Sequence, residues 1–256
     1  TYTTGITNSS FDVLRYGDEA YFVAAADSRG CATGWSGINL VTGNPVAAPS
    51  VLSDHPIQSA AISPYGLVVT TDGACTTPSK VQTYTPGDVN AEGKVPYRRD
   101  YATPLAAHVI AVSPTGGGVA YVRDGVDNPG SVYVTVNMGL PPDISIAKRI
   151  VLPEGCTATA LAYAGTDLVA GVTCAQSDGT TVLTVLRWDS NGTLLMRKDV
   201  TTKFKEAAIS DIAVVGQDIY YVVNAEGLES YLYKLGTTKT DATVPATNLF
   251  HIAAQP

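Results

Sequence analysis

Charged residues are scarce in this chain, and cationic ones are scarcer than acidic ones. Only 15% of the 256 residues are charged, against about 25% in an average globular protein. The 16 Lys and Arg are outnumbered by 23 Asp and Glu, which leaves a formal net charge of −7. Binding to nucleic acid or to an anionic membrane requires cationic side chains at the surface. The composition therefore predicts no nucleic-acid partner.

Long apolar runs and cofactor motifs are also missing. No stretch is apolar for long enough to span a bilayer, so we predict no membrane span. No signal peptide is visible, and the chain begins with Thr1 rather than Met, which we interpret as a mature or trimmed product. The sequence contains no Walker loop, no dinucleotide fingerprint and no haem attachment motif. It therefore predicts no bound nucleotide or haem.

Five short apolar strands each run into a tight turn that ends in glycine. The glycines are spaced 49, 50, 49 and 51 residues apart, at Gly17, Gly66, Gly116, Gly165 and Gly216. A period near fifty residues with several strands per period is typical of a β-propeller blade. We therefore predict an all-β fold, a five-bladed β-propeller of four-stranded antiparallel blades.

The repeat extends over nearly the whole chain, so we predict a single domain over residues 1–256. Its approximate blades are 11–56, 57–104, 105–155, 156–206 and 207–256. In the fourth unit the pattern predicts strands over 158–163, 168–173, 181–188 and 194–200. The turn at 189–192 contains Asn and Gly, which tolerate positive φ. The strand that completes the fifth blade comes either from 2–7, in the first ten residues, or from 247–252, because an open sheet edge must be covered.

Two turns carry a family resemblance. Ile62-Ser-Pro-Tyr-Gly66 and Val112-Ser-Pro-Thr-Gly116 resemble the Ser-Pro-Asp-Gly turn of TolB-type and WD40-like β-propellers, and an apolar strand follows each of them. The segments 38–43 and 187–193 resemble third-strand turns of the same group. Both Ser-Pro turns lack the Asp of the usual motif, and the fourth and fifth units lack Ser-Pro. Because that superfamily contains mostly binding platforms and some enzymes, the resemblance implies the fold and leaves the function open.

Four cysteines, an even number, predict two disulfides and an oxidising compartment. Cys31 and Cys75 each follow the second strand of adjacent units, so we predict that they pair. Cys156 and Cys174 flank the turn at Gly165 almost symmetrically, which places them opposite each other across a hairpin. A zinc site is disfavoured because no Cys-x-x-Cys spacing exists and the chain has only three histidines. These features predict a secreted, periplasmic or cell-surface protein.

Acidic residues gather on one face of the predicted propeller, where the loops between second and third strands emerge together with the loops after each fourth strand. The candidate binding residues on this face are Asp27, Asp72, Asp124, Asp127, Asp178 and Glu226. They favour a cation or a basic partner. Calcium is an open alternative at 124–128, although the order of an EF-hand loop is absent. The competing interpretation is that exposed loops are simply polar.

One aligned column of the inner strands reads Asp12, Ala61, Ala111, Ala160 and Asp211. In a closed ring the two Asp residues are neighbours near the central channel. Their expected separation is loosely compatible with the carboxylate pair of inverting glycosidases, about 6.5–9.5 Å apart. However, the second and third units carry Ala where five-bladed glycosidases need an acid. We therefore expect each Asp to accept hydrogen bonds from nearby backbone amides or hydroxyls.

Two further features bear on chemistry. His108 is a candidate base near the same face, but no Gly-x-Ser-x-Gly nucleophile motif lies beside it. The two tryptophans, Trp35 and Trp188, could join tyrosines in a sugar-binding surface, whereas pairs such as Tyr231 and Tyr233 are more typical of cross-strand packing.

Taken together, these patterns favour a non-catalytic, extracytoplasmic β-propeller that binds a protein partner or acts as an assembly scaffold. One alternative is a carbohydrate-active or carbohydrate-binding propeller that uses Asp12 and Asp211. The other is a calcium-stabilised ligand-binding propeller. No cofactor is predicted apart from the calcium of that last alternative.

Overall fold

The computed structural model of the chain consists of strands joined by turns. It describes residues 11–16, 18–25, 33–46, 57–63, 66–71, 80–84, 97–102, 107–115, 118–123, 131–134, 148–177, 180–200, 207–225, 229–236, 246–247 and 252. Every secondary-structure element in these ranges is a β-strand. The all-β fold predicted from the sequence is therefore confirmed, and none of the described segments forms a helix capable of crossing a bilayer.

The described strands form five sheets, and each sheet contains four antiparallel strands in chain order. Sheet 1 contains β1 (Phe11–Tyr16), β2 (Glu19–Ala25), β3 (Thr33–Asn39) and β4 (Pro45–Val46). Sheet 2 contains β5 (Ile57–Ser63), β6 (Gly66–Thr71), β7 (Lys80–Tyr84) and β8 (Tyr97–Ala102). Sheet 3 contains β9 (Ala107–Val112), β10 (Val119–Arg123), β11 (Ser131–Val134) and β12 (Lys148–Val151).

The last two sheets follow the same order. Sheet 4 contains β13 (Cys156–Ala164), β14 (Asp167–Ala175), β15 (Thr181–Trp188) and β16 (Leu194–Val200). Sheet 5 contains β17 (Ala207–Val215), β18 (Asp218–Ala225), β19 (Glu229–Lys234) and β20 (Ala246–Thr247). The outer strand of sheet 5 thus comes from the C-terminal part of the chain. The N-terminal alternative, residues 2–7, lies outside the described residues.

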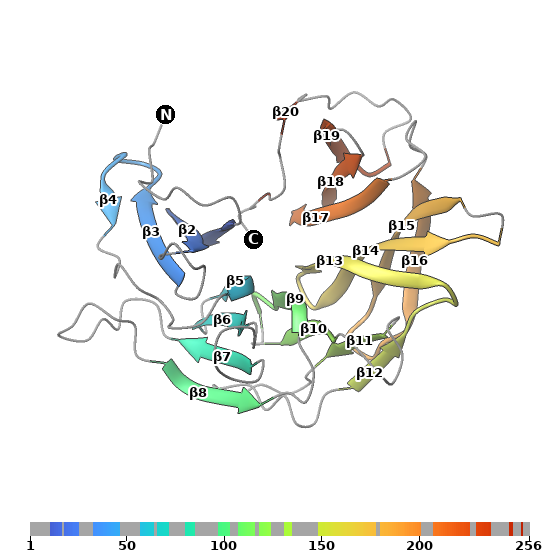
Figure 1. The fold of residues 1–256 in the computed structure, drawn as a ribbon, viewed down its shortest axis with the longest axis horizontal. Helices are drawn as coiled ribbons and strands as arrows, with labels where there is room; N and C mark the ends of the chain where they lie inside the picture. The colour runs from blue at the N-terminus through green and yellow to red at the C-terminus, as the bar shows by residue number, and fades with distance from the viewer. Residues whose placement is uncertain are drawn as a thin grey trace.

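The five sheets follow one another around a common centre (Figure 1). The first strand of each sheet packs on the first strand of the next, from β1 to β5, β9, β13 and β17. Among the described residues, β17 and β1 make no comparable contact. The sheets therefore succeed one another as propeller blades do, but packing of the described inner strands does not close the circle.

Sheet 4 confirms the strands that the sequence predicts for the fourth unit. Its first two strands are longer than predicted at both ends, and β15 and β16 have the predicted bounds. The predicted turn after β15 is also found. Gly192 has a φ of 81°, and the Asp189 carboxylate accepts the backbone amides of Asn191 and Thr193 at 2.9 and 2.7 Å. The amide of Thr193, followed by that of Asn191, lowers the pKa of Asp189.

The Ser-Pro turn of the third unit joins two sheets. Ser113 is 5% exposed, and its hydroxyl oxygen accepts the amide of Thr115 at 3.4 Å. The same hydroxyl donates to the carbonyl of Gly165, in the turn between β13 and β14, at 3.4 Å. The serine of this motif therefore holds its own turn and also contacts the equivalent turn of the next sheet.

Apolar side chains fill the spaces between neighbouring sheets. One cluster packs sheet 3 against sheet 4 and includes Val122, Val132, Val172 and Leu186. A second cluster packs sheet 4 against sheet 5 around Val169, Val185, Ile209 and Val223. The middle strands of sheet 4, β14 and β15, are consequently buried on both faces over most of their length, which explains their nearly continuous apolar sequences.

Candidate functional site

Most of the predicted site residues lie outside what the structure describes. This holds for Asp27, Asp72, Asp124, Asp127, Asp178 and Glu226, and for Cys31 and Cys75. Asp12 and His108 fall on β1 and β9, but their side chains are likewise outside the described part. The acidic face, the Cys31–Cys75 disulfide and the approach of Asp12 to Asp211 therefore stay predictions.

Asp211 is the catalytic candidate whose side chain is described. It lies on the inner strand β17 beside a β-bulge between Ile209 and Asp211. One carboxylate oxygen accepts the amide of Ile212 at 2.8 Å, and the other accepts the amide of Ile252 at 2.7 Å. The carboxylate thus accepts hydrogen bonds from backbone amides, as the sequence predicts for this residue. It holds a residue near the C-terminus against the innermost strand of sheet 5.

The predicted disulfide between Cys156 and Cys174 is confirmed. The two residues face each other directly in the register of β13 and β14, with Cα atoms 3.9 Å apart. Both side chains are buried and belong to the apolar cluster between sheets 3 and 4. The disulfide therefore ties together the two strands of sheet 4 that lie nearest the centre.

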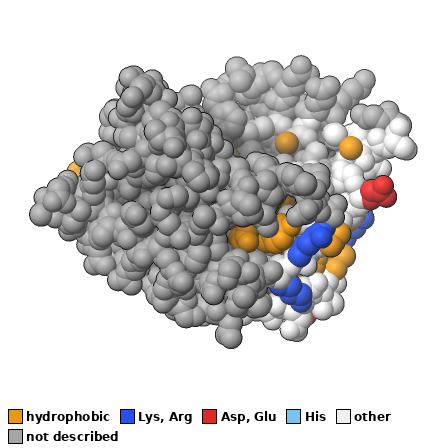
Figure 2. Space-filling model, turned by 60° about the horizontal axis from the view of Figure 1, so that its bottom comes forward, with side chains coloured by type: hydrophobic (Ala, Val, Ile, Leu, Met, Phe, Trp, Pro, Cys, Tyr) orange, Lys and Arg blue, Asp and Glu red, His pale blue; other side chains and the backbone are white. Residues whose placement is uncertain are grey.

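A groove lies between the outer strands of sheets 3 and 4. Its apolar lining comes from Ile150 and Leu152, which β12 and its continuation provide, and from Leu186, Trp188 and Leu194 on β15 and β16. The volume of this groove is roughly 470 Å³, within the range of about 300–1,000 Å³ that is usual for ligand sites. We call it the β12–β16 groove. Figure 2 shows apolar side chains with cationic ones beside them on the described part of this side of the molecule.

Cationic side chains border the β12–β16 groove. Lys148 and Arg149 come from β12, and Arg197 comes from β16. The ammonium of Lys148 donates to the carbonyl of Asn191, in the turn between β15 and β16. Arg149 donates to the hydroxyl of Ser131 at 2.9 Å. Lys148 is thereby held at the edge of sheet 3 that faces the groove, whereas the bond to Ser131 places the Arg149 side chain on the face of β12 opposite to Ile150.

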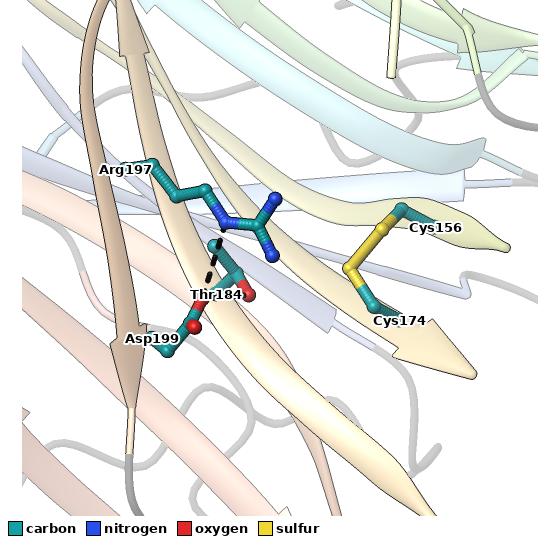
Figure 3. Close-up of a disulfide and its surroundings, with 5 residues drawn as sticks. All are labelled: Cys156, Cys174, Thr184, Arg197 and Asp199. Atoms are coloured by element: carbon teal, nitrogen blue, oxygen red, sulfur yellow. Dashed lines mark hydrogen bonds and ion pairs between the residues drawn. A yellow bond between two sulfur atoms is a disulfide. The ribbon is translucent and has the colours of Figure 1, made fainter. Parts of the chain in front are cut away.

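Arg197 is held on the other side of the groove. Its Nε donates to the Asp199 carboxylate at 3.4 Å, and the same carboxylate oxygen accepts the hydroxyl of Thr184 at 2.9 Å. Figure 3 shows the two terminal nitrogens of Arg197 directed away from Asp199. The guanidinium can therefore donate further hydrogen bonds to a ligand, in the planar fork geometry that suits a carboxylate.

The described residues contain no cluster of three or more His, Cys, Asp or Glu side chains arranged to hold a metal ion. The candidate calcium loop at 124–128 is outside the described residues, so the calcium alternative stays a prediction. The chemistry that the β12–β16 groove offers is apolar contact combined with donation to an anion.

Sequence reasoning did not find this groove. Its cations come from two sheets and lie about fifty residues apart in the chain, a distance that no local motif spans. A signal existed in the pairs Lys148-Arg149 and Arg197-Lys198, which are conspicuous in a chain with 16 cationic residues. Each pair occurs on an outer strand, but only the packing of sheets 3 and 4 brings Lys148 and Arg197 to one groove.

Comparison with solved structures supports the fold. No protein-family model matches the chain, and no curated protein matches it. The crystal structure of TolB from Acinetobacter baumannii is similar at a TM-score of 0.54 and 17% identity, covering 85% of this chain. This chain spans 51% of that TolB chain. A chain in the crystal structure of a nidogen/laminin complex is similar at a TM-score of 0.57 and 10% identity. The match covers 93% of this chain and 82% of that one.

Both similar structures are β-propellers, so this chain has a β-propeller-like fold. The resemblance inferred from the Ser-Pro turns is thereby confirmed at the level of fold. Identities of 17% and 10% carry no information about activity. The function must therefore be argued from this chain's own surface.

Proposed function

We propose that this chain is a non-catalytic, extracytoplasmic β-propeller that binds a protein partner. In this proposal the 256 residues form one five-bladed domain, with blades over 11–56, 57–104, 105–155, 156–206 and 207–256. The β12–β16 groove is the observation that carries the proposal. It combines a concave apolar floor with cationic side chains, and such a surface is characteristic of a binding site.

Exposed apolar side chains surround the groove. Leu194 at its rim is 50% exposed, and Val151 and Leu195, on the two strands that border it, are 66% and 54% exposed. Single exposed apolar residues are ordinary, but a group of them beside a concave apolar floor favours contact with another molecule. One of the similar structures is itself a complex of two proteins, nidogen and laminin, which is compatible with a propeller that binds protein.

The hydrogen bonds of Asp211 support a role without catalysis. A general acid or base must be within reach of the substrate, whereas the two oxygens of this carboxylate bond to amides of its own chain. The Cys156–Cys174 disulfide supports an extracytoplasmic location, because reducing compartments keep thiols reduced.

Paired assays of hydrolysis and capture test this function. The wild-type chain, the Asp12→Asn/Asp211→Asn variant and the exposed control Asp18→Asn are incubated with a panel of aryl glycosides. Each is also immobilised to capture proteins from the native source, and captured proteins are remade and titrated individually. We expect no hydrolysis, and saturable binding of one protein that is equal for all three chains. Hydrolysis that disappears only in the double variant, or no saturable protein binding, would refute the proposal.

A further inference from the structure

We infer that the β12–β16 groove binds an acidic, extended segment of the partner protein, with an apolar residue of that segment on the groove floor. The inference rests on the proposed protein-binding function and specifies the chemistry of the partner. Three independent observations support it: the apolar floor, the cations on its two sides, and the position of β12 and β16 as the outermost described strands of their sheets.

The floor selects for an apolar side chain. Leu186 and Trp188, on β15, provide the part of the floor from sheet 4 and are almost completely buried. Ile150 and Leu152 provide the part from sheet 3. Leu194 is half exposed at the rim. An aliphatic or aromatic side chain inserted here removes apolar surface of both molecules from water, which favours association.

The charges at the groove select for carboxylates. In the described part of the chain, Arg187, Lys234 and Arg197 each pair with a carboxylate, at 2.7, 2.6 and 3.4 Å. Lys148, in contrast, contacts a backbone carbonyl and no described carboxylate. The floor thus has Lys148 on one side and Arg197 on the other. A segment with an apolar residue between acidic ones complements this pattern.

Asp199 offsets part of the local positive charge but leaves Lys148 and the terminal nitrogens of Arg197 as donors. The Asp189 carboxylate accepts two amides of its own turn, and Asp199 contacts Arg197 through Nε alone. Glu154 is exposed in the turn before β13. Because the chain as a whole carries −7, the long-range field does not attract anions. A bound acidic segment must therefore be held by the local contacts of Lys148 and Arg197.

The strands beside the groove favour a peptide over other anions. β12 and β16 are the outermost described strands of sheets 3 and 4, and each has a described neighbour on one side only. Their outer backbone groups can pair with an extended peptide, which supplies donors and acceptors along its length. A lipid headgroup or a phosphate offers no such ladder, so we assign the groove to a peptide segment.

Fluorescence anisotropy of short labelled peptides tests the inference on the full chain. The first peptide alternates Asp and Glu with Leu and Phe. The second replaces its acids with Lys, and the third keeps its acids but replaces Leu and Phe with Ser. We expect saturable binding of the first peptide alone. Raising the salt from about 0.05 M to about 0.3 M should weaken that binding, because screening shortens the range of the attraction.

Charge reversal locates the binding site. Lys148→Glu/Arg197→Glu should weaken binding of the first peptide at least about tenfold, as expected when close charge pairs become repulsive. The matched control is Lys198→Glu, which introduces the same negative charge on the opposite face of β16 and should leave the affinity within about twofold. Arg197→Glu alone gives a second variant, which leaves the contact between Lys148 and Asn191 in place. Melting curves establish that each variant is folded.

Three results would overturn the inference. They are equal binding of all three peptides, equal affinity of Arg197→Glu and Lys198→Glu, and binding of anionic phospholipid vesicles in place of the peptide. If the captured partner still binds the Lys148→Glu/Arg197→Glu chain with unchanged affinity, the groove is not its site and protein binding itself stands. Failure of the wild-type chain to bind any captured protein contradicts the proposed function instead.

Discussion

A Cβ atom added to Gly171 would lie 2.5 Å from Cγ2 of Ile209 and 3.0 Å from its Cβ. Gly171 is on β14 of sheet 4, and Ile209 is a fully buried residue on β17 of sheet 5. No ordinary non-bonded contact is that short, and close-packed interiors cannot absorb an added methyl group without rearrangement. The close approach of sheets 4 and 5 therefore depends on the absence of a side chain at position 171.

Gly171→Ala should destabilise the chain by about 1–3 kcal/mol, the usual cost of overpacking a core. Urea unfolding followed by circular dichroism measures the change in free energy of unfolding. Ile209→Ala removes the atom that clashes, so the double variant should lose less stability than the sum of the two single variants. Strict additivity would show that sheets 4 and 5 are not in contact at this point.

A second contact between sheets 4 and 5 is a hydrogen bond. Thr159 on β13 donates from its hydroxyl to the carbonyl of Ile209 at 2.6 Å. Thr159→Val keeps the shape of the side chain but removes the donor, and should lower the free energy of unfolding by about 1–2 kcal/mol. Thr157→Val, at an exposed position of the same strand, is the control and should change stability by less than about 0.5 kcal/mol. Equal effects at both positions would contradict a special role for Thr159.

The Cys156–Cys174 disulfide closes a loop with a sequence separation of 18, and such a loop corresponds to about 3 kcal/mol of stabilisation. Cys156→Ala/Cys174→Ala should therefore lower the melting temperature by several degrees. Replacing both cysteines leaves no unpaired thiol at either position. A non-reduced peptide map should show the two cysteines in linked peptides. Free thiols at both positions in protein from the native source would contradict the extracytoplasmic proposal.

Tyr163 on β13 has a buried hydroxyl with no hydrogen-bond partner in the described part of the chain. Burial also raises its pKa. Tyr163→Phe removes an unsatisfied polar group and should be neutral or stabilise the chain by up to about 1 kcal/mol at pH 7. Thermal melts measure this change. Thr159→Val is the comparison, because it removes a hydroxyl that has a hydrogen-bond partner and should lower stability. A loss of more than about 1 kcal/mol would mean that the hydroxyl has a partner after all.

Tyr221 should make the stability sensitive to alkaline pH. Burial, followed by the charge of Tyr233, raises the pKa of Tyr221 to about 12, and the two rings stack at 5.4 Å. Because the pKa is higher in the folded state, the contribution of the neutral phenol is complete below about pH 10. It declines as the pH rises from there to about 12. Tyr221→Phe should flatten this decline in urea unfolding measured across that range, and an unchanged slope would contradict the burial of the hydroxyl.

The fourth unit shows which features local sequence can predict. The apolar segment 181–188 and the Asn-Gly turn at 191–192 predict a strand and a hairpin, because strand and turn preferences act between residues close in the chain. The pairing of Cys156 with Cys174 follows from the sequence for the same reason, since the register of one hairpin is set by the position of its turn. Cross-strand packing of Tyr233 is found with Tyr221 on β18, at 5.4 Å, whereas Tyr231 and Tyr233 are neighbours on β19 with tilted rings 6.2 Å apart.

The amino-acid sequence by itself determined the hairpins, their grouping into repeated four-stranded sheets and one of the disulfides. The tertiary structure decided that Asp211 bonds to Ile252, that Gly171 admits Ile209, and that Lys148 and Arg197 border a common groove. These relationships join residues 38 to 49 positions apart in the chain, and they depend on the angle and distance at which neighbouring sheets pack. Alternation and turn chemistry fix each sheet separately, whereas the groove exists only where two sheets meet.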